Sequence, residues 1–185
     1  MADSGEQELW IFGYGSLVWR PDFPHAEAVP AWSAGQQRRF WQASTDHRGT
    51  PARPGRVATL VPEPGARCRG VAYRIRTGSR DEVLAYLDHR EKNGYLKRTL
   101  GIELDDGRRG EAITYVADPA GEHYLGAAPL AEMARQIRTS IGPSGPNSEY
   151  VLRLAEALRG LGAPDQEEVF ALEALLRPPE PGSGP

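Results

Sequence analysis

The sequence predicts an α+β domain with a largely antiparallel sheet or small barrel and helices packed against it. Two observations support this class. The first half of the chain holds short segments rich in aromatic and β-branched residues, separated by Gly, Pro and Asp, as is typical of strands. The second half holds apolar residues at helical spacing, and strands followed by helices favour α+β over an alternating α/β order.

Six segments of the first half have the strand pattern. They are residues 9–13, 38–43, 56–61, 69–75, 97–104 and 111–117. Three apolar stripes in the second half predict three helices. The stripes are Leu130, Met133, Ala134, Ile137 and Ile141; Val151, Leu154, Ala155, Leu158 and Leu161; and Val169, Leu172 and Leu176. Gly142-Pro143 and Gly162 are stop signals, and Asp165 with Glu168 forms a capping box before the last stripe.

One further helix is predicted between the strands. Ser79 and Glu82 have the spacing of a capping box, so this helix should begin near Arg80, and its capping role explains Glu82 without catalysis. Asn93-Gly94 is a stop signal. The apolar face of the helix consists of Val83, Leu84, Tyr86 and Leu87.

Glu91 falls on the apolar face of this helix, four residues after Leu87. The pattern therefore aims a carboxylate at the core side of the last turn. Loss of water and the negative end of the helix dipole would both raise the pKa of this carboxyl, which suits a general base. An ion pair with Arg90 or Lys92 at the helix edge is the structural alternative.

Composition narrows the class of protein. The chain has 185 residues, enough for one domain, and its net charge of −3 gives no support for a nucleic-acid-binding face. Its one cysteine, Cys68, allows no internal disulfide and is expected to be buried and inert. No apolar run approaches the ~20 residues of a membrane helix, and the acidic start has no signal-peptide pattern. We therefore expect a soluble cytoplasmic protein.

We expect a single domain over residues 9–177, between a flexible N-terminus (1–8) and a disordered Pro/Gly-rich tail (178–185). The four histidines show no ligand spacing, and Cys68 has no partner cysteine, so no metal site is expected. These histidines are His25, His47, His89 and His123.

The stretch from Trp10 to Trp19 carries the most distinctive motif. An apolar strand runs into Gly13-Tyr14-Gly15-Ser16, where glycine permits a left-handed backbone or a close approach of another group. The N–H groups of such a turn can bind a carboxylate, a phosphate or a developing oxyanion. The Rossmann and Walker patterns are incomplete, and Ser16 lacks a Gly-x-Ser-x-Gly elbow. A tight turn without function is the remaining alternative.

Two loops are rich in polar and turn-forming residues. Residues 44–56 carry Arg48, Arg53 and Arg56 between glycines and prolines, which suits a mobile lid that meets an anion and equally suits a solvated surface loop. Residues 142–147 link two helices and suit a helix stop, a turn and an N-cap.

Six segments of the chain form a distinctive combination. They are WIFGYGSLVWRPDFP (10–24), RRFWQASTDHRGTPARPGRVATLV (38–61), GVAYRI (70–75), YLDHREKNGY (86–95), YLGAAPL (124–130) and GPSGPNSEY (142–150). Together these segments resemble the ChaC family of glutathione-specific γ-glutamylcyclotransferases. The resemblance implies a γ-glutamylcyclotransferase-like fold, a small mixed β-barrel flanked by helices. It also implies cleavage of glutathione to 5-oxoproline and cysteinylglycine without a metal or an organic cofactor.

The resemblance assigns residues as well. The family's catalytic glutamate matches Glu91, and its glycine turn is implied to hold the γ-glutamyl group. The substrate-binding segment is Ile11, Phe12, Gly13, Tyr14, Gly15, Ser16 and Leu17. For the glycine carboxylate of glutathione we favour Arg48 among Arg39, Arg48, Arg53 and Arg56. Asn93 and Ala127 stand where relatives often have glycine.

In the implied reaction the substrate's own α-amine attacks its γ-carbonyl, while Glu91 removes the amine proton and delivers it to the leaving nitrogen. Two alternatives stay open: a cyclotransferase for other γ-glutamyl amino acids or amines, and a non-catalytic module that binds γ-glutamyl peptides. The expected partner is small-molecule glutathione, with no nucleic acid and no membrane. A monomer and a homodimer are both compatible with the sequence.

Overall fold

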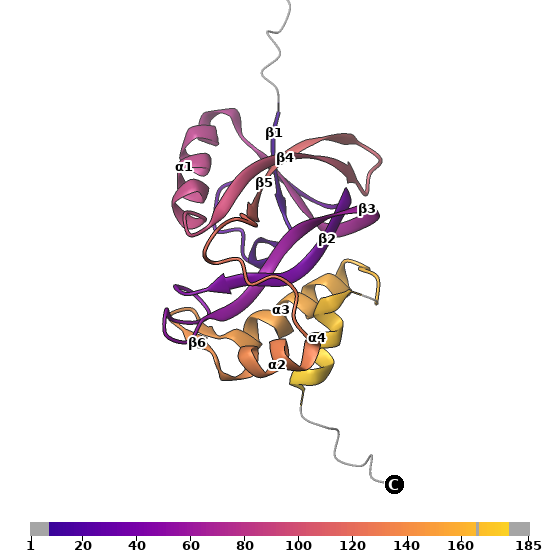
Figure 1. The fold of residues 1–185 in the computed structure, drawn as a ribbon. Helices are drawn as coiled ribbons and strands as arrows, with labels where there is room; N and C mark the ends of the chain where they lie inside the picture. Colours follow the sequence, from indigo (N-terminus) through magenta and orange to yellow (C-terminus); the bar gives the residue numbers. More distant parts are fainter. Residues whose placement is uncertain (1–7, 166, 178–185) are drawn as a thin grey trace, which may run out of the picture.

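A closed five-stranded barrel lies at the centre of the computed structural model, which describes residues 8–165 and 167–177. Its strands are β1 (Leu9–Gly13), β2 (Glu27–Ser44), β3 (Gly55–Ile75), β4 (Tyr95–Leu104) and β5 (Arg109–Ala117), and their order around the barrel is β1-β3-β2-β4-β5 (Figure 1). All pairs are antiparallel except β1 and β5, which run in parallel and meet at Ile11 and Ile113. The predicted α+β class with a mostly antiparallel barrel is confirmed.

The two terminal segments predicted to be flexible or disordered are largely outside this description. Residues 1–7 of the predicted N-terminal segment and all of the predicted tail, 178–185, are not among the described residues. The division into one domain over 9–177 stays a prediction.

Strands β2 and β3 form one long hairpin that is much longer than the sequence pattern indicated. β2 has 18 residues and β3 has 21, whereas the pattern predicted only 38–43 for β2 and two separate strands for β3. Pro30 and Gly35 obscured the first half of β2. Gly35 has φ +71 beside a register shift between Ala34 and Gln36, so a bulge bends the strand there without ending it.

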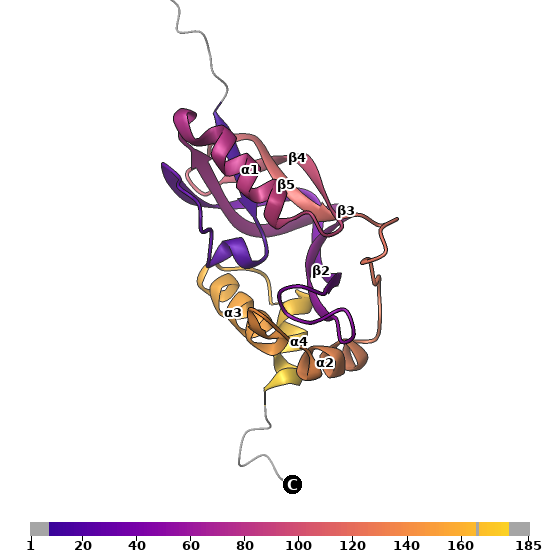
Figure 2. The same cartoon turned by 90° about the vertical axis from the view of Figure 1, so that its left-hand side faces the viewer.

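Four α-helices flank the barrel. α1 (Arg80–Arg90) lies along one side of it, and α2 (Leu130–Thr139), α3 (Asn147–Gly160) and α4 (Glu168–Leu176) pack together at the other end of the β2–β3 hairpin (Figures 1 and 2). One apolar core joins the barrel interior to these three helices, and a second core lies beneath α1. The short helix η1 (Ser16–Val18) follows β1, and η2 (Thr77–Ser79) precedes α1.

Several predicted helix boundaries are wrong in detail. α2 ends at Thr139, and Ile141 instead begins the short strand β6 (Ile141–Gly142), where it is 63% exposed. This strand pairs with β7 (Gly145–Pro146), so residues 142–147 form a small hairpin before α3. In α1, Tyr86 belongs to the exposed surface and not to the apolar face.

The two predicted capping boxes do not form. α1 does begin at Arg80 as expected, but the Ser79 side chain makes no capping hydrogen bond. α4 begins at Glu168 after Glu167, so Asp165 lies too early in the chain to cap it. The Glu168 carboxylate instead accepts a hydrogen bond from the Phe40 N–H at 2.7 Å and ties α4 to β2.

Arg38 is a buried polar connection between the barrel and the helical layer. Its buried guanidinium donates to the Tyr14 carbonyl at 2.8 Å, to the Arg69 carbonyl and to the Glu167 carboxylate. The same side chain therefore contacts the turn after β1, strand β3 and the start of α4.

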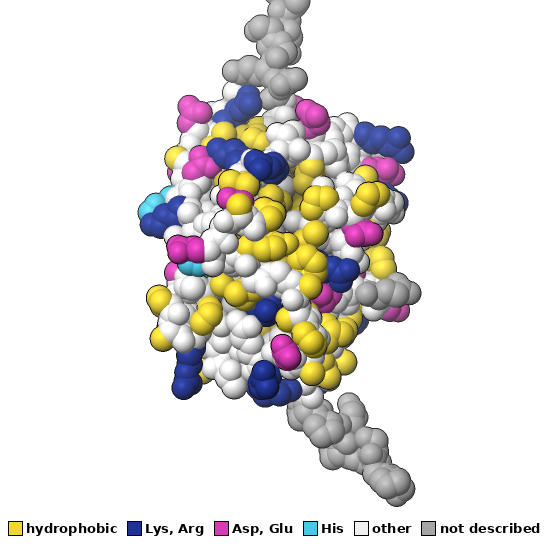
Figure 3. Space-filling view, in the orientation of Figure 1, with side chains coloured by type: hydrophobic (Ala, Val, Ile, Leu, Met, Phe, Trp, Pro, Cys, Tyr) yellow, Lys and Arg dark blue, Asp and Glu magenta, His cyan; other side chains and the backbone are white. Residues whose placement is uncertain are grey.

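The surface carries charges of both signs. On the face shown in Figure 3, Lys and Arg side chains alternate with Asp and Glu, and hydrophobic side chains gather between them across the middle. None of the helices in the described part of the chain is long and apolar enough to cross a membrane.

Candidate active site

The glycine turn after β1 is shaped by close packing. A Cβ on Gly13 would lie 2.7 Å from the Cβ of Leu17, and one on Gly15 would lie 2.9 Å from the Tyr150 hydroxyl oxygen. Neither glycine has a left-handed φ, so of the two reasons considered for glycine here, close approach is the one that applies. The N–H groups of Ser16 and Leu17 lie in the first turn of η1, where a helix offers no carbonyl of its own to bond them.

Glu91 lies directly after the last turn of α1 and faces a cavity. Its N–H donates to the Leu87 carbonyl at 2.9 Å, and Gly94, at φ +84, turns the chain towards β4. The Glu91 side chain is 19% exposed, and its Oε1 lies 3.6 Å from Nε of Arg90. The inward direction expected from the helix pattern and the ion pair expected as its alternative therefore occur together.

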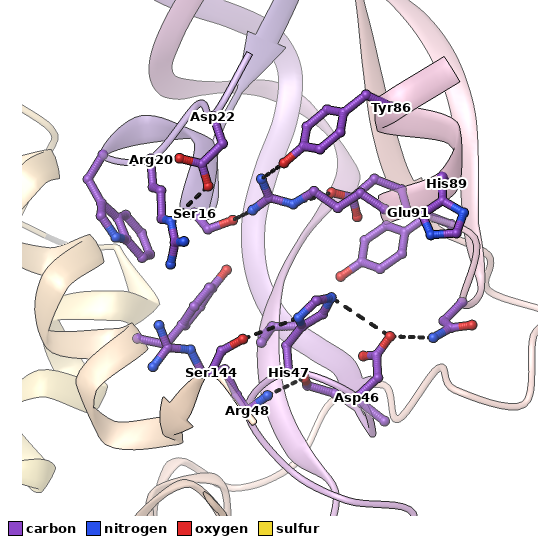
Figure 4. Close-up of a pocket in the computed structure, with 18 residues that line it drawn as sticks. Ser16, Arg20, Asp22, Asp46, His47, Arg48, Tyr86, His89, Glu91 and Ser144 are labelled. Atoms are coloured by element: carbon purple, nitrogen blue, oxygen red, sulfur yellow. Dashed lines mark hydrogen bonds and ion pairs between the residues drawn. The ribbon is translucent and has the colours of Figure 1, made fainter. Parts of the chain in front are cut away.

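The cavity has a volume of about 390 Å³ and lies between α1, the glycine turn, the β2–β3 loop and the start of α3. Figure 4 shows Ser16 and Glu91 on one side of it, with Arg48 and Ser144 on the other (Figure 4). Its lining residues are Ser16, Trp19, Arg20, Asp22, Ala43, Ser44, Asp46, His47, Arg48, Val57, Tyr86, His89, Arg90, Glu91, Asn93, Tyr95, Ser144 and Tyr150. A cavity of this size suits a small molecule.

A smaller cavity of about 60 Å³ adjoins the first and shares Ser16, Glu91, Tyr95 and Tyr150 with it. The glycine turn forms its wall through Tyr14, Gly15, Ser16 and Leu17. Four tyrosines thus line this cavity with Glu91 from different elements: Tyr14 after β1, Tyr95 on β4, Tyr115 on β5 and Tyr150 on α3.

The tyrosines around Glu91 remain protonated over the ordinary pH range. Burial, with a further contribution from the Glu91 carboxylate, raises the pKa of Tyr14 and of Tyr95 well above the ordinary value. Burial raises the pKa of Tyr150 to about 12. Tyr14 is already engaged, because its hydroxyl donates to the Tyr115 carbonyl at 2.6 Å.

The pKa of Glu91 is raised above its ordinary value. Burial is the largest cause, the Arg90 guanidinium opposes it, and the negative charge of Asp46 adds to it. A carboxylate whose charge is poorly solvated accepts a proton readily, which is the property required of a general base near neutral pH.

Only Arg48 of the four candidate arginines lines this cavity. Arg39 pairs with Glu168, and Arg56 bonds to Gln136 and to the carbonyls of Phe40 and Gly126. Arg53 is exposed on the surface.

Arg48 belongs to a loop that is hydrogen-bonded to the end of β2 and to the β6–β7 hairpin. Its N–H donates to Oγ of Ser44 at 2.9 Å, and the Ser144 N–H donates to the His47 carbonyl at 2.9 Å. Its guanidinium donates to the Pro146 carbonyl at 3.2 Å and lies 3.8 Å from the Glu149 carboxylate. The segment predicted as a lid is therefore held against the β6–β7 hairpin in this conformation.

A chain of polar contacts crosses the cavity mouth below Glu91. Asn93 donates to the Asp46 carboxylate, His47 Nε2 lies 3.8 Å from the same carboxylate, and His47 Nδ1 is 3.3 Å from Oγ of Ser144 (Figure 4). The turn that carries Glu91 is thereby joined to the β2–β3 loop and to the β6–β7 hairpin.

Comparison with known proteins identifies the family. Residues 9–178 match the protein family described as ChaC-like protein. The chain belongs to the ChaC-like family. The resemblance of its segments is confirmed, and four of the six segments that carried it, 10–24, 38–61, 86–95 and 142–150, contribute residues that line the cavities just described.

Curated relatives of this ChaC-like chain include two that are 42% identical to it. Glutathione-specific gamma-glutamylcyclotransferase 1 of Danio rerio aligns over 94% of this chain and 91% of its own, and gamma-glutamylcyclotransferase 2-3 of Arabidopsis thaliana over 85% and 83%. A crystal structure of the glutathione-specific γ-glutamyl cyclotransferase from yeast has a TM-score of 0.86 at 30% identity, over 92% of this chain and 96% of that one.

Five of the seven residues in the predicted binding segment of this ChaC-like chain line a cavity, and two do not. Ser16 lines both cavities, and Phe12, Tyr14, Gly15 and Leu17 line the smaller one. Ile11 and Gly13 line neither of the two. Ile11 is fully buried in the core beneath α1, and Gly13 packs against Leu17.

Sequence reasoning did not single out Tyr95, Tyr150 and Arg90 as site residues. Each lies within a segment of the ChaC-like resemblance, Arg90 inside 86–95, Tyr95 at its end and Tyr150 at the end of 142–150, but only the fold brings Tyr150 next to Glu91. The ring of Tyr150 is buried and its hydroxyl accepts the Ala58 N–H at 3.2 Å, which fixes it at the cavity wall.

Groups that could hold a metal ion are absent among residues 8–165 and 167–177, where no three His, Cys, Asp or Glu side chains are clustered. Cys68 is buried in the main core, as expected, and burial raises its pKa to about 11. A thiol with so high a pKa is not a nucleophile at neutral pH.

Proposed function

We propose that this protein cleaves glutathione to 5-oxoproline and cysteinylglycine by intramolecular aminolysis. The observation that carries the proposal is that Glu91, with its raised pKa, shares one small-molecule-sized cavity with the glycine turn. Two relatives at 42% identity over most of the chain, from Danio rerio and Homo sapiens, are named as glutathione-specific γ-glutamylcyclotransferases, which supports the same substrate.

Glu91 is the general acid and base of the proposed reaction. It removes a proton from the α-ammonium of the γ-glutamyl group, and the freed amine attacks the γ-carbonyl carbon. The new C–N bond closes the five-membered ring, and the attacking nitrogen gives up a second proton as it becomes the lactam N–H. The amide bond to cysteine breaks as Glu91 returns its proton to the leaving nitrogen, and the second proton ends on the same nitrogen, which leaves as the ammonium group of cysteinylglycine. Nucleophile and electrophile belong to one molecule, so the cavity contributes by holding the γ-glutamyl chain folded.

In this proposal the glycine turn holds the γ-glutamyl group through the residues of the predicted segment that line the cavities, Phe12, Tyr14, Gly15, Ser16 and Leu17. Ser16 and Leu17 of this turn line the small cavity beside Glu91, and in the proposed reaction their N–H groups stabilise the carbonyl oxygen as it gains negative charge during the attack of the amine. Arg48, on the opposite side of the main cavity, binds the carboxylate of the glycine residue.

The test is incubation of the purified protein with reduced glutathione, without added metal, and measurement of both products by mass spectrometry. Equal amounts of 5-oxoproline and cysteinylglycine are expected. Glu91→Gln should lower kcat by about 10²- to 10⁴-fold because it removes the proton-transfer group. Glu82→Gln is the matched control: it lies exposed on α1 away from the cavity and should keep the activity.

Other results would favour the alternatives. Release of 5-oxoproline from γ-glutamyl-alanine but not from glutathione would indicate a cyclotransferase for other γ-glutamyl compounds. Saturable binding of glutathione without any 5-oxoproline would indicate a binding module. Wild-type kcat in Glu91→Gln would contradict the assigned base.

The cytoplasmic location, the independence of cofactors and the choice between monomer and homodimer stay predictions.

A further inference from the structure

The guanidinium of Arg90 lies between the glycine turn and Glu91. Its Nη2 donates to Oγ of Ser16 at 2.7 Å, and its Nε lies 3.6 Å from Oε1 of Glu91. The side chain lines the main cavity and is 19% exposed, so a molecule in the cavity can reach it. No other side chain in the described part of the chain links the glycine turn to Glu91 by a hydrogen bond or an ion pair.

Arg90 keeps hydrogen-bonding capacity. A guanidinium has five N–H donors, and the bond to Ser16 uses one of them. Its contact with Glu91 at 3.6 Å and that with the Tyr86 hydroxyl at 3.5 Å are longer than a well-formed N–H···O bond. Arg90 is thus a partly buried cation whose remaining N–H groups can donate hydrogen bonds to a second carboxylate.

The chemistry of the substrate brings a second carboxylate to this place. The proposed base must lie within about 2.6–3.2 Å of the α-amine that it deprotonates. The α-carboxylate is attached to the same carbon as that amine, so it comes close to the negative charge of Glu91. Two carboxylates in one site repel each other unless a cation neutralises them.

The other two arginines of the cavity are placed differently. Arg20 is exposed and paired with Asp22 at 2.7 Å, and Arg48 lies on the far side beside Pro146. We propose that Arg90 binds the α-carboxylate of the γ-glutamyl group together with the Ser16 hydroxyl. This assignment rests on the proposed function and extends it. It leaves the N–H groups of the glycine turn for the γ-carbonyl oxygen.

The assignment gives each carboxylate of glutathione its own arginine. Arg90, on α1, receives the α-carboxylate next to the reacting amine, and Arg48, on the β2–β3 loop, receives the glycine carboxylate. The two arginines come from different elements and are separated by the cavity, which matches a substrate with a carboxylate at each end.

Two analogues test the assignment separately. One is 4-aminobutanoyl-cysteinylglycine, which lacks only the α-carboxylate and cyclises to 2-pyrrolidinone. The other is the C-terminal amide of glutathione, which lacks the charge of the glycine carboxylate. The ratio of kcat/KM for glutathione to that for each analogue is measured for the wild type, Arg90→Met and Arg48→Met.

Arg90→Met should reduce the preference for glutathione over the decarboxylated analogue by roughly 10- to 100-fold, the range for hydrogen bonds to a charged group. It should leave the preference over the amide unchanged. Arg48→Met should give the opposite pattern. Intrinsic differences in amine basicity between the substrates cancel, because each preference is compared between variant and wild type.

Two results would overturn the assignment. If Arg90→Met slows glutathione and the decarboxylated analogue by the same factor, Arg90 acts only on Glu91. If Arg48→Met abolishes the preference over that analogue, the α-carboxylate lies on Arg48. Arg90→Lys keeps the charge and should retain part of the preference, which keeps the test decisive if Arg90→Met is poorly folded.

A failure of the proposed function would appear separately, as absence of 5-oxoproline from the wild type with glutathione. Dissociation constants of glutathione and the decarboxylated analogue, measured by calorimetry on the wild type and Arg90→Lys, then decide the assignment. Tighter binding of glutathione by the wild type, weakened in the variant, supports it. Equal constants for the two compounds contradict it.

Discussion

The Glu91 carboxylate shows how its neighbours determine the chemistry of one side chain. Burial raises its pKa, Arg90 lowers it, and Asp46 across the cavity mouth raises it again. The tyrosines that line the small cavity with it, Tyr14, Tyr95, Tyr115 and Tyr150, are neutral because their pKa values are raised. The Glu91 carboxylate therefore has a raised pKa although two charged side chains lie near it. Changes at Arg90 or Asp46 should alter this pKa.

The pH dependence of kcat/KM should reflect this environment. A general base acts when ionised, so activity is lost as pH falls through the pKa of Glu91, and this acid limb should lie above the ordinary range for a glutamate. Asp46→Asn removes a negative charge that raises the pKa of Glu91, so the limb should move to lower pH. Rates measured from about pH 4 to about pH 9 check this shift.

The matched control for the pH experiment is Asp22→Asn. Asp22 lines the same cavity, but it is bonded to Arg20 and is not among the causes of the Glu91 shift. Its acid limb should coincide with that of the wild type. An unchanged limb in Asp46→Asn would show that Asp46 does not influence the base.

The side-chain amide of Asn147, which is buried, joins the β2–β3 hairpin to the first residue of α3. The Arg56 N–H donates to Oδ1 of Asn147 at 2.7 Å, and Nδ2 of Asn147 donates to the Arg56 carbonyl at 2.8 Å. Both groups of one β3 residue are thus bonded to a helix residue. This contact fixes the end of the hairpin, and with it the loop that carries Arg48.

Asn147→Ala should destabilise the protein by about 2–4 kcal/mol, because it leaves two buried main-chain groups without partners. Urea denaturation measures the change in the free energy of unfolding. Glu156→Ala is the control on the same helix; its side chain is exposed, and its effect should stay within about 0.5 kcal/mol. Equal stability of Asn147→Ala and Glu156→Ala would contradict the role of this amide.

At the scale of the whole molecule, the barrel and the helical layer share one apolar core and are connected by Arg38. Its side chain is 1% exposed and its partner Glu167 is 13% exposed, so loss of either partner leaves a charge in a poorly hydrated place. Arg38 also bonds the Tyr14 carbonyl, which links the stability of the interface to the shape of the glycine turn.

Arg38→Met should lower the free energy of unfolding by about 3–5 kcal/mol, the range for breaking a buried ion pair. The double variant Arg38→Met/Glu167→Gln should lose less than the sum of its two single variants, because the uncompensated carboxylate is removed as well. Denaturant unfolding of the four proteins measures this coupling. Strict additivity would mean that the two side chains do not interact.

The sequence was sufficient for the fold class, the inward direction of Glu91 and the glycine turn, because each depends on local periodicity or on a short motif. It was not sufficient for the length of β2, where Pro30 and Gly35 resemble breaks but a bulge carries the strand onward. Tyr150 could not be predicted beside Glu91, since they are far apart in sequence and only the packing of α3 against the barrel brings them together.

Closure of the barrel by β1 and β5 also bears on how the protein is made. Strand β1 leaves the ribosome before its partners, which are residues 71–75 of β3 and Ile113 of β5. It must therefore wait, unpaired, until most of the barrel has been synthesised, and contacts so distant in sequence form slowly. Since the glycine turn follows β1 directly, a nascent chain truncated before β5 contains both the turn and Glu91 but cannot close the barrel that holds them together.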